Sequence, residues 1–313
     1  MPQHRAKIVI TGIAGRLGRL LAKQLHRTGR YEIIGIDRRP FEDKPADVVH
    51  ARVDIRSKRT RDVFRSQKIS ALIHLGLMHD PRRSVREHHE WNVVATQHLL
   101  EYCRHYQVPK VVVLSSASVY GPRPENPQFL TEDSPLLAAQ DDPNSLTLVE
   151  ADMLANSFFW KYREGDTVIL RPVHTLGQVA NAVSNYLRME RIPVLMGFDP
   201  MLQVIHEADV VDAVVLALAK GVRGIYNIVG PSEVPVSVLV REARKPTFPI
   251  PHFLAPVVSK LFWNLGMSPF RGSELNHLRY VCMVDGSRAR GDLGFRPTRT
   301  IKEAVRAALD DTF

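Results

Sequence analysis

KIVITGIAGRLG, residues 7–18, is the stretch that decides the fold, because a β-branched run ends directly in a turn rich in glycine. Leucines follow at helical spacing, at positions 17, 20, 21 and 25, so the turn joins a predicted strand to a predicted helix. Glycine lets the backbone approach a pyrophosphate here, and the helix N-terminus offers amide donors to its oxygens. The sequence therefore predicts a dinucleotide-binding turn made by Gly12, Ile13, Ala14, Gly15, Arg16, Leu17 and Gly18.

A second predicted strand ends at Asp37, where a carboxylate can accept hydrogen bonds from the ribose hydroxyls of an adenosine. The same carboxylate repels a 2′-phosphate, so we expect NAD as the cofactor and NADP to be less favoured. Arg38 and Arg39 follow at once, and an arginine at this point is able to hold a 2′-phosphate. The cofactor prediction therefore depends on which of these side chains faces the ribose.

Short β-branched runs alternate with amphipathic stretches over the first 180 residues, which is typical of βαβ units on a parallel sheet. We predict an α/β protein with a Rossmann-type doubly wound parallel sheet over residues 1–175 and a smaller, interleaved substrate-binding region of mixed α/β structure over 176–313. The predicted strands span residues 7–11, 32–37, 48–53, 71–75, 110–115 and 167–171, with later strands at 202–205 and 224–229; the predicted helices include 91–106, 208–220 and 301–309.

Composition narrows the function classes. The 313 residues lack an apolar run of membrane-spanning length, and the first residues lack a signal-peptide pattern, so a cytoplasmic protein is expected. Two scattered cysteines, Cys103 and Cys282, predict neither a disulfide framework nor a metal centre. The formal net charge of +9 favours anionic partners, but without a helix-turn-helix or zinc pattern we do not expect nucleic-acid binding.

The spacing TGxxGxxG resembles the extended short-chain dehydrogenase/reductase family, the NAD-dependent epimerases and dehydratases. Matching motifs recur as Ser115–Gly121 after the fifth predicted strand, Arg171-Pro172 after the sixth, and Leu293–Pro297 near the end, so the resemblance covers nearly the whole chain. It implies further cofactor contacts at Asp54, Ile55, Leu75, Gly76, Asn92, Ser115, Pro172 and Val173. Because one fold hosts many reactions, the resemblance predicts the fold more firmly than the chemistry.

The resemblance also implies a catalytic tyrosine, a lysine four residues later that lowers its pKa, and a serine that orients the carbonyl. Ser116 matches the serine. Counting back from Arg171 places Asn144 at the tyrosine position and Leu148 at the lysine position, and no tyrosine or lysine occurs between Tyr120 and Trp160. The usual acid and its activating cation are therefore missing from the sequence.

Three interpretations follow from this departure. The chain holds NAD without turnover, as a regulatory pseudoenzyme; or it uses a substitute acid such as Tyr120, His174 or Glu150; or its substrate needs no such acid. Each substitute also has a structural alternative. Tyr120 fits a packed turn residue, His174 a loop residue and Glu150 a solvent-facing one.

A UDP-sugar substrate is disfavoured on the same comparison. Sugar-nucleotide epimerases carry two arginines for the diphosphate, and this chain has Leu202 and Leu275 at those positions, although Arg271 or Arg279 would be able to compensate. We expect a small-molecule carbonyl or hydroxyl substrate, which the apolar 254–267 segment suggests is hydrophobic.

The 254–267 segment carries an apolar stripe made by Leu254, Val257, Val258, Leu261, Phe262 and Leu265, widened by Trp263 and Met267. It suits a core helix or a dimer contact; alternatively it covers an apolar substrate or lies on a membrane surface. A homodimer is expected in any case, because the resemblance implies pairing through the helices at 91–106 and 149–162.

Overall fold

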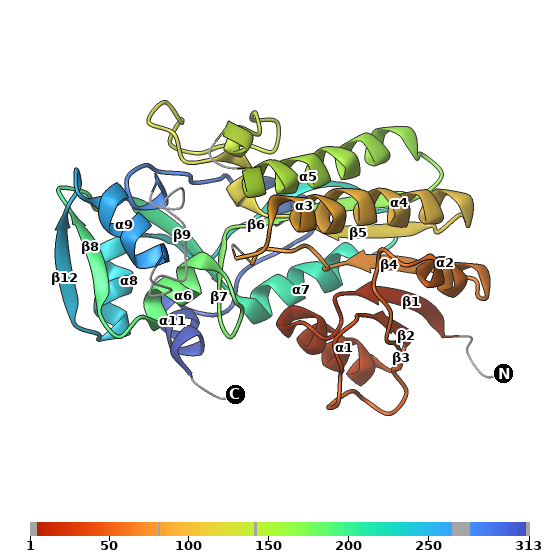
Figure 1. Cartoon of the computed structure of the whole chain (residues 1–313). Helices are drawn as coiled ribbons and strands as arrows, with labels where there is room; N and C mark the ends of the chain where they lie inside the picture. Colours follow the sequence, from red (N-terminus) through yellow and green to blue (C-terminus); the bar gives the residue numbers. More distant parts are fainter. Residues whose placement is uncertain (1–4, 81, 141–142, 265–275, 311–313) are drawn as a thin grey trace.

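A parallel sheet of seven strands forms the centre of the protein, seen in a computed structural model that describes residues 5–80, 82–140, 143–264 and 276–310 (Figure 1). The strand order is β10-β6-β5-β4-β1-β2-β3, and all neighbours run parallel. The strands are β1 (Ala6–Thr11), β2 (Tyr31–Ile36), β3 (Val49–Ala51), β4 (Ala71–His74), β5 (Lys110–Leu114), β6 (Asp166–Pro172) and β10 (Gly224–Ile228). The predicted doubly wound Rossmann-type sheet is confirmed.

Helices cover both faces of this sheet because successive strand residues point to opposite sides. Ile8 and Ile10 face a core shared with α1 (Arg16–Thr28), α7 (Glu207–Ala217) and α10 (Ser287–Asp292). Val9 faces the opposite core, shared with α2 (Lys58–Arg65), α4 (Ala95–His105) and α5 (Pro143–Lys161), so α4 and α5 lie across the sheet from α1 and α7 (Figure 1).

The order of the strands reverses at β1: β2 and β3 are added on one side of it, and β4, β5 and β6 on the other. In open parallel sheets this switch point is where ligands bind, at the carboxyl ends of the strands. Gly12 follows β1 and Gly76 follows β4, and a Cβ on Gly12 would lie 3.0 Å from the Gly76 Cα. The sheet therefore brings two predicted cofactor segments together at the switch point.

The predicted helix at 91–106 begins earlier and less regularly than its sequence suggests. It starts as α3 (Val85–His88), continues as a π-helical segment (His89–Val94) and becomes α4. The π-helical segment holds Asn92, which is fully buried and whose side chain bonds to the backbone N and O of Met78 and to Thr147 Oγ1. The irregular turn thus fixes the loop after β4 against α5. Two 3₁₀ turns, Ala117–Tyr120 and Ala138–Gln140, precede α5.

A second, smaller group of elements packs around its own apolar cluster at the far end of the molecule (Figure 1). It contains the sheets β11-β9-β7 and β12-β8 and several helices. Its elements are β7 (His174–Leu176), α6 (Ala182–Arg188), β8 (Ile192–Met196), β9 (Met201–His206), β11 (Glu233–Pro235), α8 (Val236–Ala243), β12 (Thr247–Pro251), α9 (Ala255–Asn264) and α11 (Ile301–Leu309). Because β10 from this part of the sequence joins the main sheet, the two parts interleave, and the division at residue 175 stays a prediction.

A buried ion pair locks α5 to the sheet. Arg171, in β6, donates through Nη2 and Nε to the two carboxylate oxygens of Asp152, at 2.6 and 2.9 Å, and both side chains are at most 1% exposed. Asp152 also accepts the Ser115 hydroxyl at 2.6 Å. Burial alone would lower the pKa of Arg171, but pairing with Asp152 outweighs it and the pKa is raised.

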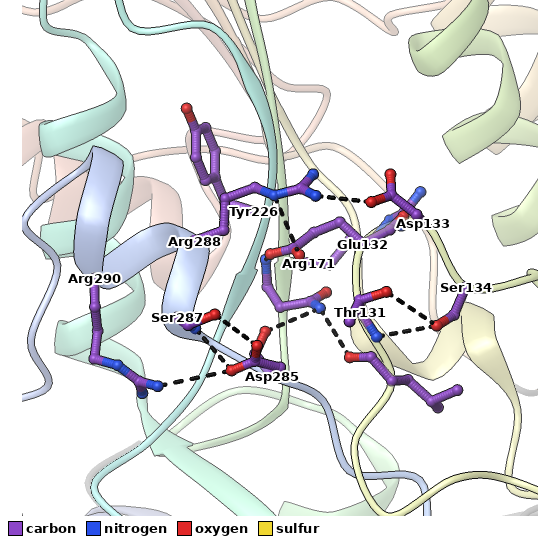
Figure 2. A network of polar contacts seen from close by, with 12 residues as sticks. Thr131, Glu132, Asp133, Ser134, Arg171, Tyr226, Asp285, Ser287, Arg288 and Arg290 are labelled. Carbon is purple, nitrogen blue, oxygen red and sulfur yellow. Dashed lines mark hydrogen bonds and ion pairs between the residues drawn. The ribbon is translucent and has the colours of Figure 1, made fainter.

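The polar network continues on the other side of Arg171 toward the C-terminal part of the chain, as Figure 2 shows. Its Nη1 donates to the backbone oxygen of Glu132, and the Glu132 carboxylate accepts from the Asn227 amide in β10. Arg288 in α10 then lies 3.5 Å from Glu132 and donates to Asp133 at 2.8 Å. The network ties α10 and residues 130–134 to the same end of the sheet.

We predict that Arg171→Met loses about 3–5 kcal/mol in the free energy of unfolding, because it leaves the Asp152 charge buried without its cation. Urea unfolding followed by circular dichroism measures this. The matched control is Asp62→Asn, which breaks an exposed 3.0 Å pair with Arg65 and should cost at most about 1 kcal/mol. A loss below about 1 kcal/mol for Arg171→Met would show that the pair does not lock the helix.

Candidate functional site

A cleft of about 1260 Å³ opens at the carboxyl ends of the central strands. Its walls come from the glycine turn, the loops after β2, β4, β5 and β6, the first turns of α5, and α6 and α8 of the smaller region. The sequence-predicted residues that line it are Gly12, Ala14, Gly15, Arg16, Leu17, Gly18, Asp37, Arg38, Ile55, Leu75, Gly76, Ser115, Ser116, Asn144, Leu148, Pro172, Val173 and His174. One cleft therefore collects most of the predicted site.

Four predicted residues lie outside the described cleft lining. Ile13 is fully buried in the core below the turn, and Asn92 holds the loop after β4 from behind. The Asp54 carboxylate accepts from the Arg56 guanidinium at 2.7 and 2.9 Å, a hydrogen bond that holds the Asp54 pKa below its usual value. Tyr120 is buried, with its hydroxyl bonded to Asn227 and Arg171.

The glycine turn has the geometry that a bound pyrophosphate needs. Gly12 has φ +73°, and a Cβ on Gly18 would lie only 2.4 Å from the Gly12 oxygen, so neither position accepts a side chain. Helix α1 begins at Arg16 with no side-chain cap at Gly15 and no acidic residue in its first turn. No capping side chain and no first-turn carboxylate therefore competes for the backbone amide donors at this end of α1. The helix dipole also favours an anion there.

Asp37 stands at the end of β2 with a carboxylate that is only 3% exposed. It accepts from the Ala14 amide at 3.2 Å and from the Arg39 amide and guanidinium at 2.9–3.1 Å. The same hydrogen bonds raise the pKa of Arg39. Arg38 lies with its guanidinium carbon 4.8 Å from the centre of the Trp91 ring, which also lines the cleft. Asp37 therefore stays the predicted ribose acceptor, and its carboxylate already pairs with the Arg39 guanidinium.

The part of the cleft between the end of β5 and the start of α5 is lined by Ser116, Asn144 and Leu148. The Ser116 and Ser118 hydroxyls are 2.8 Å apart, and Ser116 accepts from the Ser118 amide at 3.1 Å. Asn144 and Leu148 come from the first two turns of α5. A carboxamide has no proton of useful pKa, and leucine offers neither a charge nor a hydrogen bond. These positions cannot perform the acid and cation roles that the resemblance assigns to them.

Two histidines meet in the same cleft. The rings of His174 and His277 lie edge to face, with centroids 5.0 Å apart. Burial lowers the pKa of His174 to about 4 and that of His277 to about 3, so both rings are neutral at pH 7. Neutral imidazole can exchange hydrogen bonds with a substrate oxygen but is a poor proton donor at this pH. Sequence reasoning missed His277, because nothing local marks it and it lies about one hundred residues beyond His174.

Tyr120 and Glu150, the other two candidates for a substitute acid, do not line the described part of the cleft. The Tyr120 hydroxyl donates to Asn227 at 2.9 Å and accepts from Arg171 at 2.8 Å, the residue is 1% exposed, and burial raises its pKa to about 12. Tyr120 is not among the described residues that line the cleft, so its geometry is that of a packed turn residue. Glu150 lies 3.4 Å from His89 on the outer side of α5. Of the three, only His174 reaches the cleft.

The end of the cleft in the smaller region is lined mainly by apolar side chains, with polar ones such as Thr175, Gln178 and Asn181 among them. Its lining there includes Val183, Leu187, Leu202, Val236, Leu239 and Leu278. Leu202, at the position where sugar-nucleotide epimerases carry an arginine, is 5% exposed and packs into the apolar cluster of the smaller region. Arg279 donates to the His252 oxygen at 2.8 Å and is not among the described cleft residues, while Arg271 and Leu275 lie outside the described residues.

Comparison with known proteins agrees with this geometry. Residues 8–229 match the NAD dependent epimerase/dehydratase family, and the chain belongs to it. An uncharacterised protein of Mycobacterium tuberculosis (strain H37Rv) is 26% identical over 321 residues, covering 100% of this chain and 84% of the relative. UDP-glucose 4-epimerase 1 of Oryza sativa is 27% identical over 252 residues, covering 68% and 70%.

Solved structures show the same fold. MoeE5 in complex with UDP-glucuronic acid and NAD has a TM-score of 0.75 at 24% identity, covering 97% of this chain and 98% of that one. dTDP-glucose 4,6-dehydratase from Bacillus anthracis in complex with NAD has a TM-score of 0.73 at 17% identity, covering 97% and 95%. NAD as the cofactor is confirmed at the level of the family, whereas the preference over NADP stays a prediction.

We predict that Gly12→Val abolishes NAD binding in isothermal titration calorimetry, because its side chain would enter the contact with Gly76 and needs a strained φ. Gly291→Ala in α10 is the matched control, since its Cβ meets nothing within 4 Å, and it should bind as the unmodified protein does. Unchanged NAD affinity in a folded Gly12→Val variant would place the cofactor elsewhere.

We also predict that NAD binds at least roughly 10-fold more tightly than NADP, which is the worth of one hydrogen bond to a charged group. The reason is that the Asp37 carboxylate is suited to ribose hydroxyls and repels a 2′-phosphate. Calorimetry with both cofactors measures the ratio, and Asp37→Ala should reduce it. Equal or tighter NADP binding would mean that Arg38 and Arg39, rather than Asp37, determine the cofactor.

Proposed function

We propose that the protein is an NAD-dependent oxidoreductase or epimerase that acts on an apolar carbonyl or hydroxyl compound through an atypical active site. One observation carries the proposal: a single cleft contains the dinucleotide turn at one end, Asn144 and Leu148 in the middle, and an apolar wall at the other end. The cleft thus has surfaces for a cofactor and for a substrate, but it lacks the usual tyrosine and lysine for proton transfer.

The chemistry divides between cofactor and chain. NAD supplies the hydride acceptor or, when reduced, the donor. The chain must orient the substrate oxygen and handle its proton. Ser116 can donate to that oxygen, supported by Ser118. His174 is neutral at pH 7 and can accept a hydrogen bond from a substrate hydroxyl. Since the cleft lacks a tyrosine and lysine at positions 144 and 148, turnover should be slow.

The substrate class is inferred from the far end of the cleft. One relative named above is a UDP-glucose 4-epimerase, and a UDP-sugar carries a diphosphate. Leucine cannot make the charge-assisted hydrogen bonds that an arginine gives to a diphosphate. In this chain Leu202 is buried among apolar side chains. An apolar substrate body would instead gain stability from burial against this wall.

A second candidate is a regulatory protein that holds NAD without turnover. Leu148 favours it, because this substitution removes both the cation that activates an acid and a donor to the nicotinamide ribose. The Arg171 network, the glycine turn and Asp37 are all independent of that position, so cofactor binding would survive the loss of catalysis.

A homodimer that pairs through the helices at 91–106 and 149–162 is also proposed, and α5 supplies the support for it. Leu146, Met153 and Trp160 are spaced by seven residues along one face of α5 and are 39%, 58% and 62% exposed. Large apolar side chains in one exposed row support an interface between two copies of the chain.

We predict that Asn144→Tyr with Leu148→Lys raises NADH formation from decan-2-ol by roughly 10²- to 10⁴-fold, the usual worth of general acid/base catalysis. Absorbance of NADH is the readout. The control is Asn144→Phe with Leu148→Met, which adds similar bulk without a titrating group and should not gain activity.

Two further results discriminate between the candidates. Rapid turnover by the unmodified protein that His174→Ala or Ser116→Ala abolishes would remove the regulatory candidate and contradict the expectation of slow turnover, because a competent substitute acid would then be present. Rapid conversion of UDP-galactose to UDP-glucose by the unmodified protein would remove the apolar substrate class.

A further inference from the structure

Helix α9 has apolar residues on two sides, and only one side is used for packing. Ala255 is 2% exposed and packs with Val258 against the core of the smaller region. On the other side Val257 and Leu261 are 67% and 53% exposed, and Phe253, in the turn just before the helix, is 69% exposed. Their spacing of four residues makes one outward stripe. Val257 and Leu261 belong to the predicted stripe of the 254–267 segment and Phe253 extends it, whereas the side chain of Phe262 and residues 265–267 lie outside the described parts.

The stripe continues into a basic surface. The Phe253 ring centroid lies 5.9 Å from that of His252, which lies 5.6 Å from that of Phe198. Phe198 in turn lines a hollow of about 460 Å³ together with Arg241 and Arg244 of the α8 end. We call the surface made by Phe198, Phe253, Val257, Leu261, Arg241 and Arg244 the α9 face.

Other charges in the hollow do not cancel this basic character. Asp199 is the acidic residue among its described lining, and its carboxylate accepts from the Ser237 amide at 2.9 Å and hydroxyl at 2.6 Å. Lys245 adds a third cation and donates to the Arg188 oxygen at 2.6 Å. The formal net charge of the whole chain is +9, so the long-range field also attracts anionic surfaces.

We propose that the α9 face is a docking surface for an anionic phospholipid membrane. Exposed aromatic and aliphatic side chains can enter the boundary between head groups and acyl chains, while arginines beside them meet lipid phosphates. Within the described parts of the chain, no helix has the length and hydropathy of a membrane span.

The docking surface adjoins the substrate end of the cleft. Tyr186, Val236 and Leu278 line both the hollow and the large cleft. Docking would therefore bring the apolar wall of the cleft to the lipid surface, from which an apolar substrate could enter. This consequence rests on the proposed function, whereas the docking itself does not.

Sedimentation with sucrose-loaded vesicles tests the proposal, using the full chain with NAD present. Vesicles of phosphatidylcholine mixed with phosphatidylglycerol should bind the protein, vesicles of phosphatidylcholine alone should bind it weakly, and added salt should release it. Val257→Glu with Leu261→Glu should weaken binding at least roughly 10-fold. Arg241→Gln with Arg244→Gln should weaken it by roughly 10-fold as well.

The matched controls make the same kinds of substitution at exposed positions outside the α9 face. Val49→Glu alters an exposed valine on β3, and Arg59→Gln with Arg65→Gln removes two exposed charges from α2. Both should bind vesicles much as the unmodified protein does, apart from a small uniform charge effect in the second. NAD affinity measured by calorimetry should be unchanged in every variant, which shows that the fold is intact.

The proposal is overturned if the unmodified protein does not sediment with anionic vesicles, or if the α9 variants bind as tightly as the unmodified protein. It is also overturned if the α9 variants convert a dimer to monomers in analytical ultracentrifugation, which would assign the α9 face to a second copy of the chain. These outcomes are independent of NADH formation, so docking and the proposed function can fail separately.

Discussion

The buried pair between Arg171 and Asp152 fixes the geometry on which the rest of the site depends. It joins β6 to α5, and Asp152 also holds Ser115 at the end of β5, so the helix that carries Asn144 and Leu148 has one position over the strand ends. A buried charge with two partners allows little displacement, since losing either partner leaves an uncompensated charge. The same pair ties Arg171 to Asp152, the residue through which the count places the predicted tyrosine and lysine positions at Asn144 and Leu148.

Much of the nucleotide-binding half was predictable because its signals are local. The glycine turn, Asp37 and the alternating strands lie within short windows, and their partners follow from the parallel-sheet pattern. The smaller region was less predictable. Strands β8 and β12 contain prolines and are short, so the sequence predicts neither, although it does predict strands at 202–205 and 224–229 in this segment. The meeting of His174 with His277 and the place of Tyr120 depend on contacts between distant segments, which no local pattern encodes.

The cleft changes character along its length, and this contrast underlies the proposed function. Its nucleotide end carries Arg16, Asp37 and Arg38, and Arg16 reaches across to the buried Glu207 of α7 at 2.6 Å. Its other end offers leucine and valine side chains and histidines kept neutral by burial. Under the proposed function, the charged dinucleotide and the apolar substrate body would thus bind at separate ends of the cleft. Proton transfer needs a group that titrates near neutral pH, and the usual tyrosine and lysine positions of the cleft do not supply one.

A crystal structure of the complex with NAD tests the central claim most directly, namely that the dinucleotide site is intact while the proton donor and its cation are lost. The account predicts the pyrophosphate on the glycine turn at the α1 N-terminus, with Asn144 and Leu148 beside the nicotinamide ribose and Ser116 and His174 nearest the reactive carbon. The account would be contradicted if a tyrosine or lysine from another segment, such as Tyr186, lay within hydrogen-bond distance of the nicotinamide ribose or of the substrate oxygen position.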